Sequence, residues 1–94
     1  MNKTTIIKLA PNILKRMEYG IDRFYLLNFN NDELWVGNIA SFLIISEIDG
    51  IKSIGEIINI VKNQFENYSD EQIYNSTLEI IEELVDKSFL EIVK

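Results

Sequence analysis

The stretch RFYLLNFNNDELWVG, residues 23–37, decides the fold. It contains two runs rich in aliphatic and aromatic residues, Arg23–Phe29 and Glu33–Gly37. Between them lies Asn30-Asn31-Asp32, and Asn and Asp tolerate the left-handed backbone that tight turns require. The pattern predicts a β-hairpin.

The register of this hairpin has two alternatives. A turn at Asn30-Asn31 pairs Leu27 with Leu34, whereas a turn at Asn31-Asp32 pairs Leu27 with Val36. Because side chains alternate along a strand, both alternatives put the same apolar residues on one face, which we expect to be the core: Tyr25, Leu27, Phe29, Leu34 and Val36.

The opposite face of the hairpin carries Phe24, Leu26, Asn28, Glu33 and Trp35, an unusually apolar set for a solvated surface. Exposed apolar patches usually mark interfaces. Two interpretations are open for Phe24, Leu26 and Trp35. They dock a partner enzyme or a second copy of the chain, or one of the chain's own ends covers them.

The segments before the hairpin are also extended. Pro11 biases the preceding residue toward extended backbone and separates a short segment, Thr5–Leu9, from the rest of the chain. A further strand is predicted over Ile13–Tyr19, because Gly20 then signals a turn.

Three helices are predicted after the hairpin. Asn38 caps the first, Ile39–Ile48, and Asp49-Gly50 lies just beyond its end. A capping box from Ser53 to Glu56 opens the second, whose apolar stripe extends to Phe65. A second capping box, from Ser69 to Gln72, opens the third helix, Asp70–Lys87, and an extended tail, Phe89–Val93, comes after it and is placed to rejoin the sheet.

The third predicted helix has a wide apolar arc. Its apolar positions cover about 160°, more than the roughly 100° that a surface helix needs to pack on a core. Either the whole arc is core, or its edge at Tyr74, Leu78 and Val85 lines a groove. We therefore expect one domain, residues 1–94, of α+β class: a three-stranded antiparallel sheet followed by three helices.

Composition excludes several functions. The 94 residues include no Cys and no His, which removes thiolate chemistry, the commonest general base and the usual zinc ligands. The four glycines are scattered and form no phosphate-binding loop. The longest uncharged run, Leu34–Ser46, is too short for the roughly 20 residues of a membrane span. We expect a soluble cytoplasmic protein that is not an enzyme and has no cofactor, metal or membrane partner.

The net charge of −6 is unevenly distributed. Residues 48–94 contain four basic and ten acidic side chains, whereas the first 47 residues are balanced. An acidic surface repels phosphate backbones, so a nucleic acid is not an expected partner. A winged-helix DNA reader would need basic residues on its recognition helix, and Asp70–Lys87 has six acidic side chains and one basic.

Three stretches resemble the PqqD-like family, the RiPP recognition elements, which serve ribosomally made, post-translationally modified peptides. Leu9–Arg16 resembles the family's opening. The residues from Asn38 through Asp49-Gly50 to Ile57 resemble its centre, and Leu78–Leu84 with Phe89-Leu90 resembles its closing helix. There are two departures: Gly37 stands where the family has Leu, and Ser88 where it often has Gly.

The resemblance implies a winged-helix-like fold and a stand-alone domain that holds the leader segment of a precursor peptide. The leader would be presented to a modifying enzyme, such as a radical-SAM protein or a leader peptidase. It would add as an extra strand beside Glu33–Gly37, in a cleft closed by the third helix. The resemblance implies main-chain contacts from Leu34, Trp35 and Val36. Apolar contacts would come from Tyr74, Leu78, Ile81 and Val85, and attraction for basic leader residues from Glu33, Glu79, Glu82 and Asp86.

The alternative is a small acidic protein of immunity or antitoxin type, which would bind a folded partner rather than an extended peptide. An acyl carrier protein is excluded, because no Asp-Ser pair is present to carry its prosthetic group.

Overall fold

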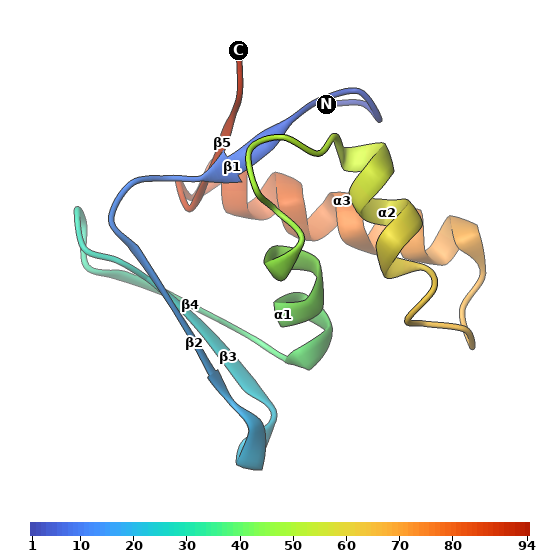
Figure 1. Ribbon diagram of the computed structural model, residues 1–94. Helices are drawn as coiled ribbons and strands as arrows, with labels where there is room; N and C mark the ends of the chain where they lie inside the picture. The colour runs from blue at the N-terminus through green and yellow to red at the C-terminus, as the bar shows by residue number, and fades with distance from the viewer.

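The computed structural model describes all 94 residues and has an α+β architecture, as predicted. Two antiparallel sheets accompany three helices (Figure 1). In chain order the elements are β1 (Ile7–Leu9), β2 (Ile13–Glu18), a 3₁₀ turn (Tyr19–Ile21), β3 (Arg23–Asn28), β4 (Glu33–Gly37), α1 (Ile39–Ser46), α2 (Ile54–Val61), α3 (Asp70–Asp86) and β5 (Leu90–Ile92).

The larger sheet has the strand order β2-β3-β4. Leu27 pairs with Leu34 and Tyr25 pairs with Val36, which confirms the register centred on Asn30-Asn31. The loop itself is wider than a two-residue turn, because strand pairing ends at Asn28 and Glu33. On the other side of β3, the pairing of β2 runs without a bulge from Ile13 to Glu18.

The predicted core face of the hairpin is wrong. Phe24 and Leu26 are 0% exposed and Asn28 is 3% exposed, so the core lies under this face. The face predicted to be buried points outward instead. The buried amide of Asn28 accepts a hydrogen bond from the Asn30 N–H and donates one to the Ser88 carbonyl. A polar side chain that makes its hydrogen bonds inside the protein can be buried at little cost. The polar character of Asn28 therefore does not show that its face is exposed to solvent.

This result also corrects the expected docking face. Phe24 and Leu26 are buried in the core and cannot contact a second copy of the chain. Trp35, from the same face, is partly buried and packs against the core cluster. Its ring meets the ring of Phe24 edge-on, with 6.5 Å between the ring centroids.

All three helices begin at the predicted caps. Asn38, Ser53 and Ser69 each accept a hydrogen bond from the backbone N–H three residues later, and each cap forms a reciprocal box. The first two helices end earlier than their apolar patterns suggested. In particular, Phe65 lies beyond the end of α2, in the connection to α3.

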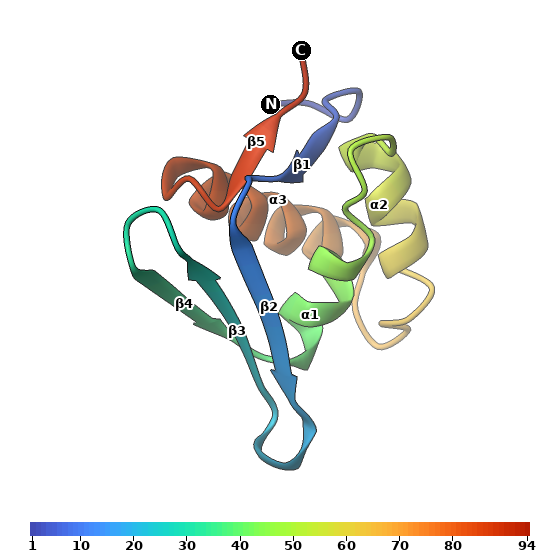
Figure 2. The same cartoon turned by 60° about the vertical axis from the view of Figure 1, so that its left-hand side comes forward.

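The two ends of the chain form the second sheet. β1 pairs with β5, so the tail meets the N-terminal segment instead of rejoining the sheet of the hairpin. Figure 2 shows this pair near both termini, and α1 packs against β3 and β4 of the larger sheet. The longest helix, α3, has 17 residues, and none of the helices combines the length and apolar content needed to cross a bilayer.

Candidate functional site

The strand β4 is an edge of the larger sheet, and its outer side has no backbone partner. Its only backbone hydrogen bonds to another segment go to β3. The N–H of Phe29 donates to the Asn12 carbonyl, so odd-numbered residues of β3 direct their backbone groups toward β2. Even-numbered residues therefore bond to β4, at Glu33, Trp35 and Gly37. Leu34 and Val36 direct their N–H and C=O groups away from the sheet.

The usual protection of an exposed edge is missing from β4. Natural edge strands are commonly blunted by Lys, Pro or a bulge. β4 has the sequence ELWVG, which contains neither residue, and its pairing with β3 is regular. The opposite edge, β2, carries the exposed cations Lys15 and Arg16. Of the two edges of this sheet, β4 is the one suited to accept another strand.

Trp35 connects this edge to α3. Its indole N–H donates to a carboxylate oxygen of Glu83. The ring also lies across Gly37, where a Cβ would come within 2.6 Å of the indole and 2.7 Å of the Ser41 hydroxyl. The two residues are therefore coupled: the ring occupies the space that any side chain at position 37 would need.

The four apolar residues of α3 that were predicted to contact a guest peptide differ in how far they are buried. Ile81 is 0% exposed, so the prediction that it contacts a guest chain is wrong: its side chain is part of the core. Tyr74, Leu78 and Val85 are partly buried against the core cluster. The ammonium of Lys3 lies 5.3 Å from the centre of the Tyr74 ring, so the N-terminal segment approaches this edge of the apolar arc.

The side of α3 that reaches β4 is the opposite edge of the arc. Glu83 makes the contact, and at 100° per residue it lies roughly 140–180° around the helix from Tyr74, Leu78 and Val85. Ile80 lies on the Glu83 side, and neither residue was predicted from the sequence to contact a guest. The sequence does show a boundary between the apolar and acidic faces at Ile80 and Glu83, which could have indicated the side of the helix that contacts the sheet. An amphipathic helix has two such boundaries, however, and its sequence does not show which of them contacts the sheet.

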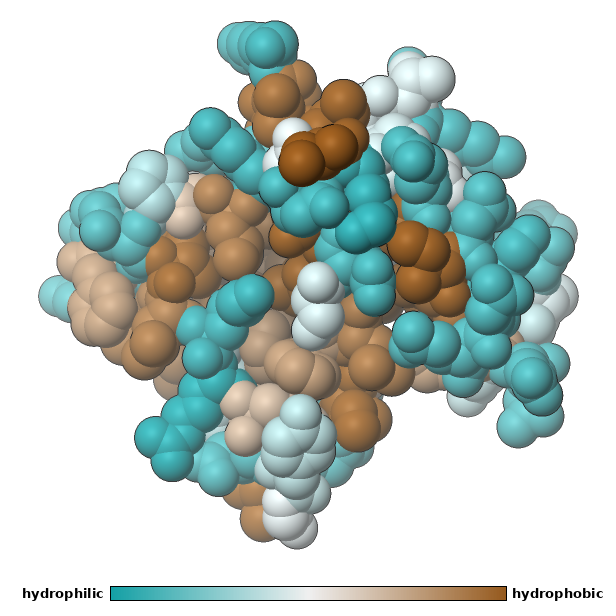
Figure 3. Space-filling view, in the orientation of Figure 1, coloured by the Kyte–Doolittle hydropathy of each residue, from teal (hydrophilic) through white to brown (hydrophobic).

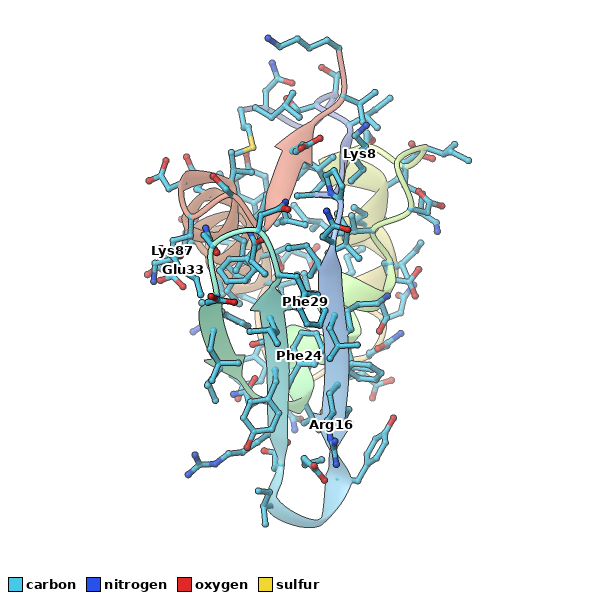
Figure 4. The ribbon with its side chains drawn as sticks, turned by 90° about the vertical axis from the view of Figure 1, so that its left-hand side faces the viewer. Lys8, Arg16, Phe24, Phe29, Glu33 and Lys87 are labelled. Atoms are coloured by element: carbon cyan, nitrogen blue, oxygen red, sulfur yellow. The ribbon has the colours of Figure 1, made fainter.

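The helix surface beside β4 is acidic. Glu79 precedes Glu83 by one turn, and Glu82 and Asp86 are exposed on the adjoining polar face. The one cation nearby is Lys87, whose ammonium lies 4.0 Å from the Glu83 carboxylate. Figure 4 shows Lys87 and Glu33 on the same side of the molecule, and Glu33, at the start of β4, is also exposed. Leu34 and Val36 project to the outer face of the sheet, exposed to solvent.

A separate apolar hollow of about 280 Å³ lies between α1, α3 and the connection that precedes α3. Its lining includes Ile80 on α3 and Ala40 on α1, together with Ile44, Val61, Phe65, Tyr68, Gln72, Ile73, Ser76 and Thr77. None of the residues predicted to bind a peptide lines this hollow.

Comparison with known proteins adds no assignment. No protein-family model, curated protein or solved structure matches this chain.

Proposed function

We propose that the chain binds an extended peptide by strand addition to the outer edge of β4, and that this peptide is the leader segment of a ribosomally made precursor. The fold would then be winged-helix-like, in keeping with the order of a three-stranded sheet followed by three helices. The observation that carries the proposal is the free edge at Leu34 and Val36, whose N–H and C=O groups have no partner. Backbone groups of an added strand would satisfy them.

The surroundings of the edge define the chemistry of the guest. An added strand presents alternate side chains to the two faces of the sheet. Those on the outer face would lie beside the exposed Leu34 and Val36, which favours apolar residues there. Those on the inner face would lie toward the acidic surface of α3, which favours Lys or Arg. The expected guest is therefore a segment of about 17 Å in which apolar and basic residues alternate.

A peptide selection provides the first test. The purified chain is immobilised and used to recover binders from a displayed library of random peptides of about twelve residues. We expect the recovered sequences to share the alternating apolar and basic pattern. The same measurement can include the first half of any short precursor encoded beside the gene, which would be the natural leader.

Matched variants then locate the binding edge. Val36→Pro removes an N–H that points away from β3, so no hydrogen bond of the sheet is lost. Proline is tolerated at such positions of an edge strand. Val36→Thr keeps the N–H and the branched shape. We expect Val36→Pro to weaken binding of a recovered peptide at least about tenfold and Val36→Thr to leave it within about threefold. Leu34→Pro and Leu34→Thr form a second pair if the first proline variant does not fold.

Equal affinity in both members of a folded pair would contradict strand addition at β4. The immunity-type alternative predicts a different result at the earlier step: no extended peptide would be recovered, because such a protein binds a folded partner.

A further inference from the structure

The outer face of the three-stranded sheet is an apolar surface that no other part of the chain covers. Leu14, Phe29, Leu34 and Val36 are 49%, 58%, 58% and 46% exposed. Tyr25 and Leu27 lie among them on the same face and are half-buried. Figure 4 views this side of the molecule, and Figure 3 shows apolar residues gathered on the side where the hairpin lies. The chain ends pair with each other elsewhere, in β1 and β5.

Strand pairing arranges this face in rows. Leu14, Leu27 and Leu34 are neighbours across the three strands and form one row. Arg16, Tyr25 and Val36 form the next row. Phe29 lies beyond the leucine row, at one end of the face, and Arg23 lies beyond the second row, at the other end.

The rows are symmetric about the middle of β3. One row lies on each side of this middle level: residues 14, 27 and 34 on one side, and residues 16, 25 and 36 on the other. Consider a two-fold axis that lies between two stacked sheets at this level and runs perpendicular to the strands. It would stack the leucine row of one copy on the Arg-Tyr-Val row of the other. It would also place Phe29 of each copy over Arg23 of the other. Sheets packed face to face keep their strands within about 30° of alignment, which permits this stacking.

Charge favours the same pairing. Arg23 takes part in no ion pair, and neither does Asp32 in the hairpin loop. The two-fold arrangement brings Arg23 of one copy toward the loop that carries Asp32 in the other. The remaining pair on the face, Arg16 with Glu18, is satisfied within one copy at 2.7 Å. The acidic half of the chain, residues 48–94, supplies no strand to this sheet, so its charges stay on the outside of the pair.

We propose that two copies of this chain associate through the outer sheet faces in this antiparallel, two-fold arrangement. The face is about 17 Å long and about 14 Å across three strands, which is small for an interface. An area of this size is typical of weak, transient contacts, so we expect the dimer to form only as the protein is concentrated. The dimer uses the side chains of the outer face, whereas strand addition uses the backbone edge of β4. The two surfaces meet at Leu34 and Val36, whose side chains belong to the outer face and whose backbone groups form the edge.

Sedimentation of the purified chain from low micromolar to millimolar concentration tests the association. We expect Leu14→Glu and Phe29→Ser each to raise the dissociation constant at least about tenfold, because each removes an apolar contact from the face. Ile51→Glu is the matched control, because Ile51 is 77% exposed but lies outside the sheet. A strict monomer at all concentrations, or a dimer unaffected by Leu14→Glu, would overturn the proposal. So would a dimer that Val36→Pro abolishes and Leu14→Glu does not, since it would be joined edge to edge.

A spin label tests the orientation. The chain has no Cys, and a side chain at Gly20 would meet no atom within 4 Å, so Gly20→Cys offers a single attachment point. The labelled copy is mixed with an isotope-labelled copy that carries no spin. We expect broadening of the amide signals of residues 30–32 in the isotope-labelled copy. Broadening of residues 18–23 instead would indicate strands stacked in parallel and would overturn the antiparallel arrangement.

Discussion

Trp35 on β4 donates the hydrogen of its indole nitrogen to the carboxylate of Glu83 on α3, 48 residues later in the chain. This contact joins the free edge of the sheet to the acidic side of the helix. The indole ring that makes it also lies across Gly37, the residue that ends β4. These contacts hold the acidic side of α3 next to β4. A strand added at this edge would therefore have backbone partners on β4 and negatively charged side chains of α3 beside it.

The crowding at Gly37 leads to the first prediction. Gly37→Ala places a Cβ 2.6 Å from the rigid indole of Trp35, and this overpacking should destabilise the fold by about 1–3 kcal/mol. Gly20→Ala is the control, because nothing lies within 4 Å of its Cβ. Urea unfolding measures both. In a Trp35→Ala background the cost of Gly37→Ala should fall, and an unchanged cost would show that the ring is not the obstacle.

A pair of leucines tests which face of the hairpin is buried. Leu26 is 0% exposed and Leu34 is 58% exposed, on neighbouring strands and opposite faces. Leu26→Ala should lower the free energy of unfolding by about 2–5 kcal/mol, and Leu34→Ala by less than about 0.5 kcal/mol. Denaturant midpoints for the two proteins give the comparison. Similar losses in both would contradict the assigned core.

The alternation of residues in the hairpin was visible in the sequence, but the buried side was not. Both faces are apolar, so a period of two separates the residues into Phe24-Leu26 and Tyr25-Leu27 without selecting either set. The polar side chain of Asn28 suggested that its face is exposed to solvent, which is wrong. Its hydrogen-bond partners, the Asn30 N–H and the Ser88 carbonyl, depend on the folded structure and are not visible in the sequence. The helix caps depend on local residues, and these predictions are confirmed. The local residues left two registers open for the hairpin, and the structure has the one centred on Asn30-Asn31.

The candidate site shows the same limit. The sequence predicted consecutive antiparallel strands with Glu33–Gly37 as the last of them, and β4 does lie at an edge of the sheet. The orientation of α3 depends on how the connections pack, and the helical pattern alone offered two boundaries. The predicted boundary was the one at Tyr74, Leu78 and Val85, whereas Glu83 contacts β4. For the same reason Ile81 was expected in the groove and is instead in the core.

The turn between α1 and α2 gives a pH-dependent prediction. Hydrogen bonds from the backbone N–H groups of Lys52 and Ile51, and from the Lys52 ammonium, lower the pKa of Asp49 from 3.8 to about 2. Because the pKa is lower in the folded state, the carboxylate stabilises the fold above about pH 4. This contribution is lost as the pH falls through about 2.

Comparing the wild type with Asp49→Asn isolates that contribution. The difference in their free energies of unfolding should be largest above about pH 4 and should shrink as the pH falls toward about 2. Urea titrations across this range measure it. A difference that stays constant with pH would show that the ionised form of Asp49 has no special role.

The carboxylate of Asp22 attaches the loop between β2 and β3 to α1. Its Oδ1 accepts a hydrogen bond from the Ile39 N–H at 2.9 Å, and its own backbone is left-handed, with φ of 51°. Asp22→Ala loses the acceptor and strains the backbone, so it should cost about 1–2 kcal/mol. Asp22→Asn keeps an acceptor and tolerates this backbone, so thermal unfolding should show little change. An equal loss in both variants would contradict a stabilising hydrogen bond from the Ile39 N–H to this side chain.

The most direct test of the central claim is amide hydrogen exchange of β4 with and without a peptide recovered from the library. Strand addition predicts that the amides of Leu34 and Val36, which face outward, become protected when the peptide binds. Those of Trp35 and Gly37, already bonded to β3, should change far less. Peptide binding that leaves the exchange of Leu34 and Val36 unchanged would contradict the account.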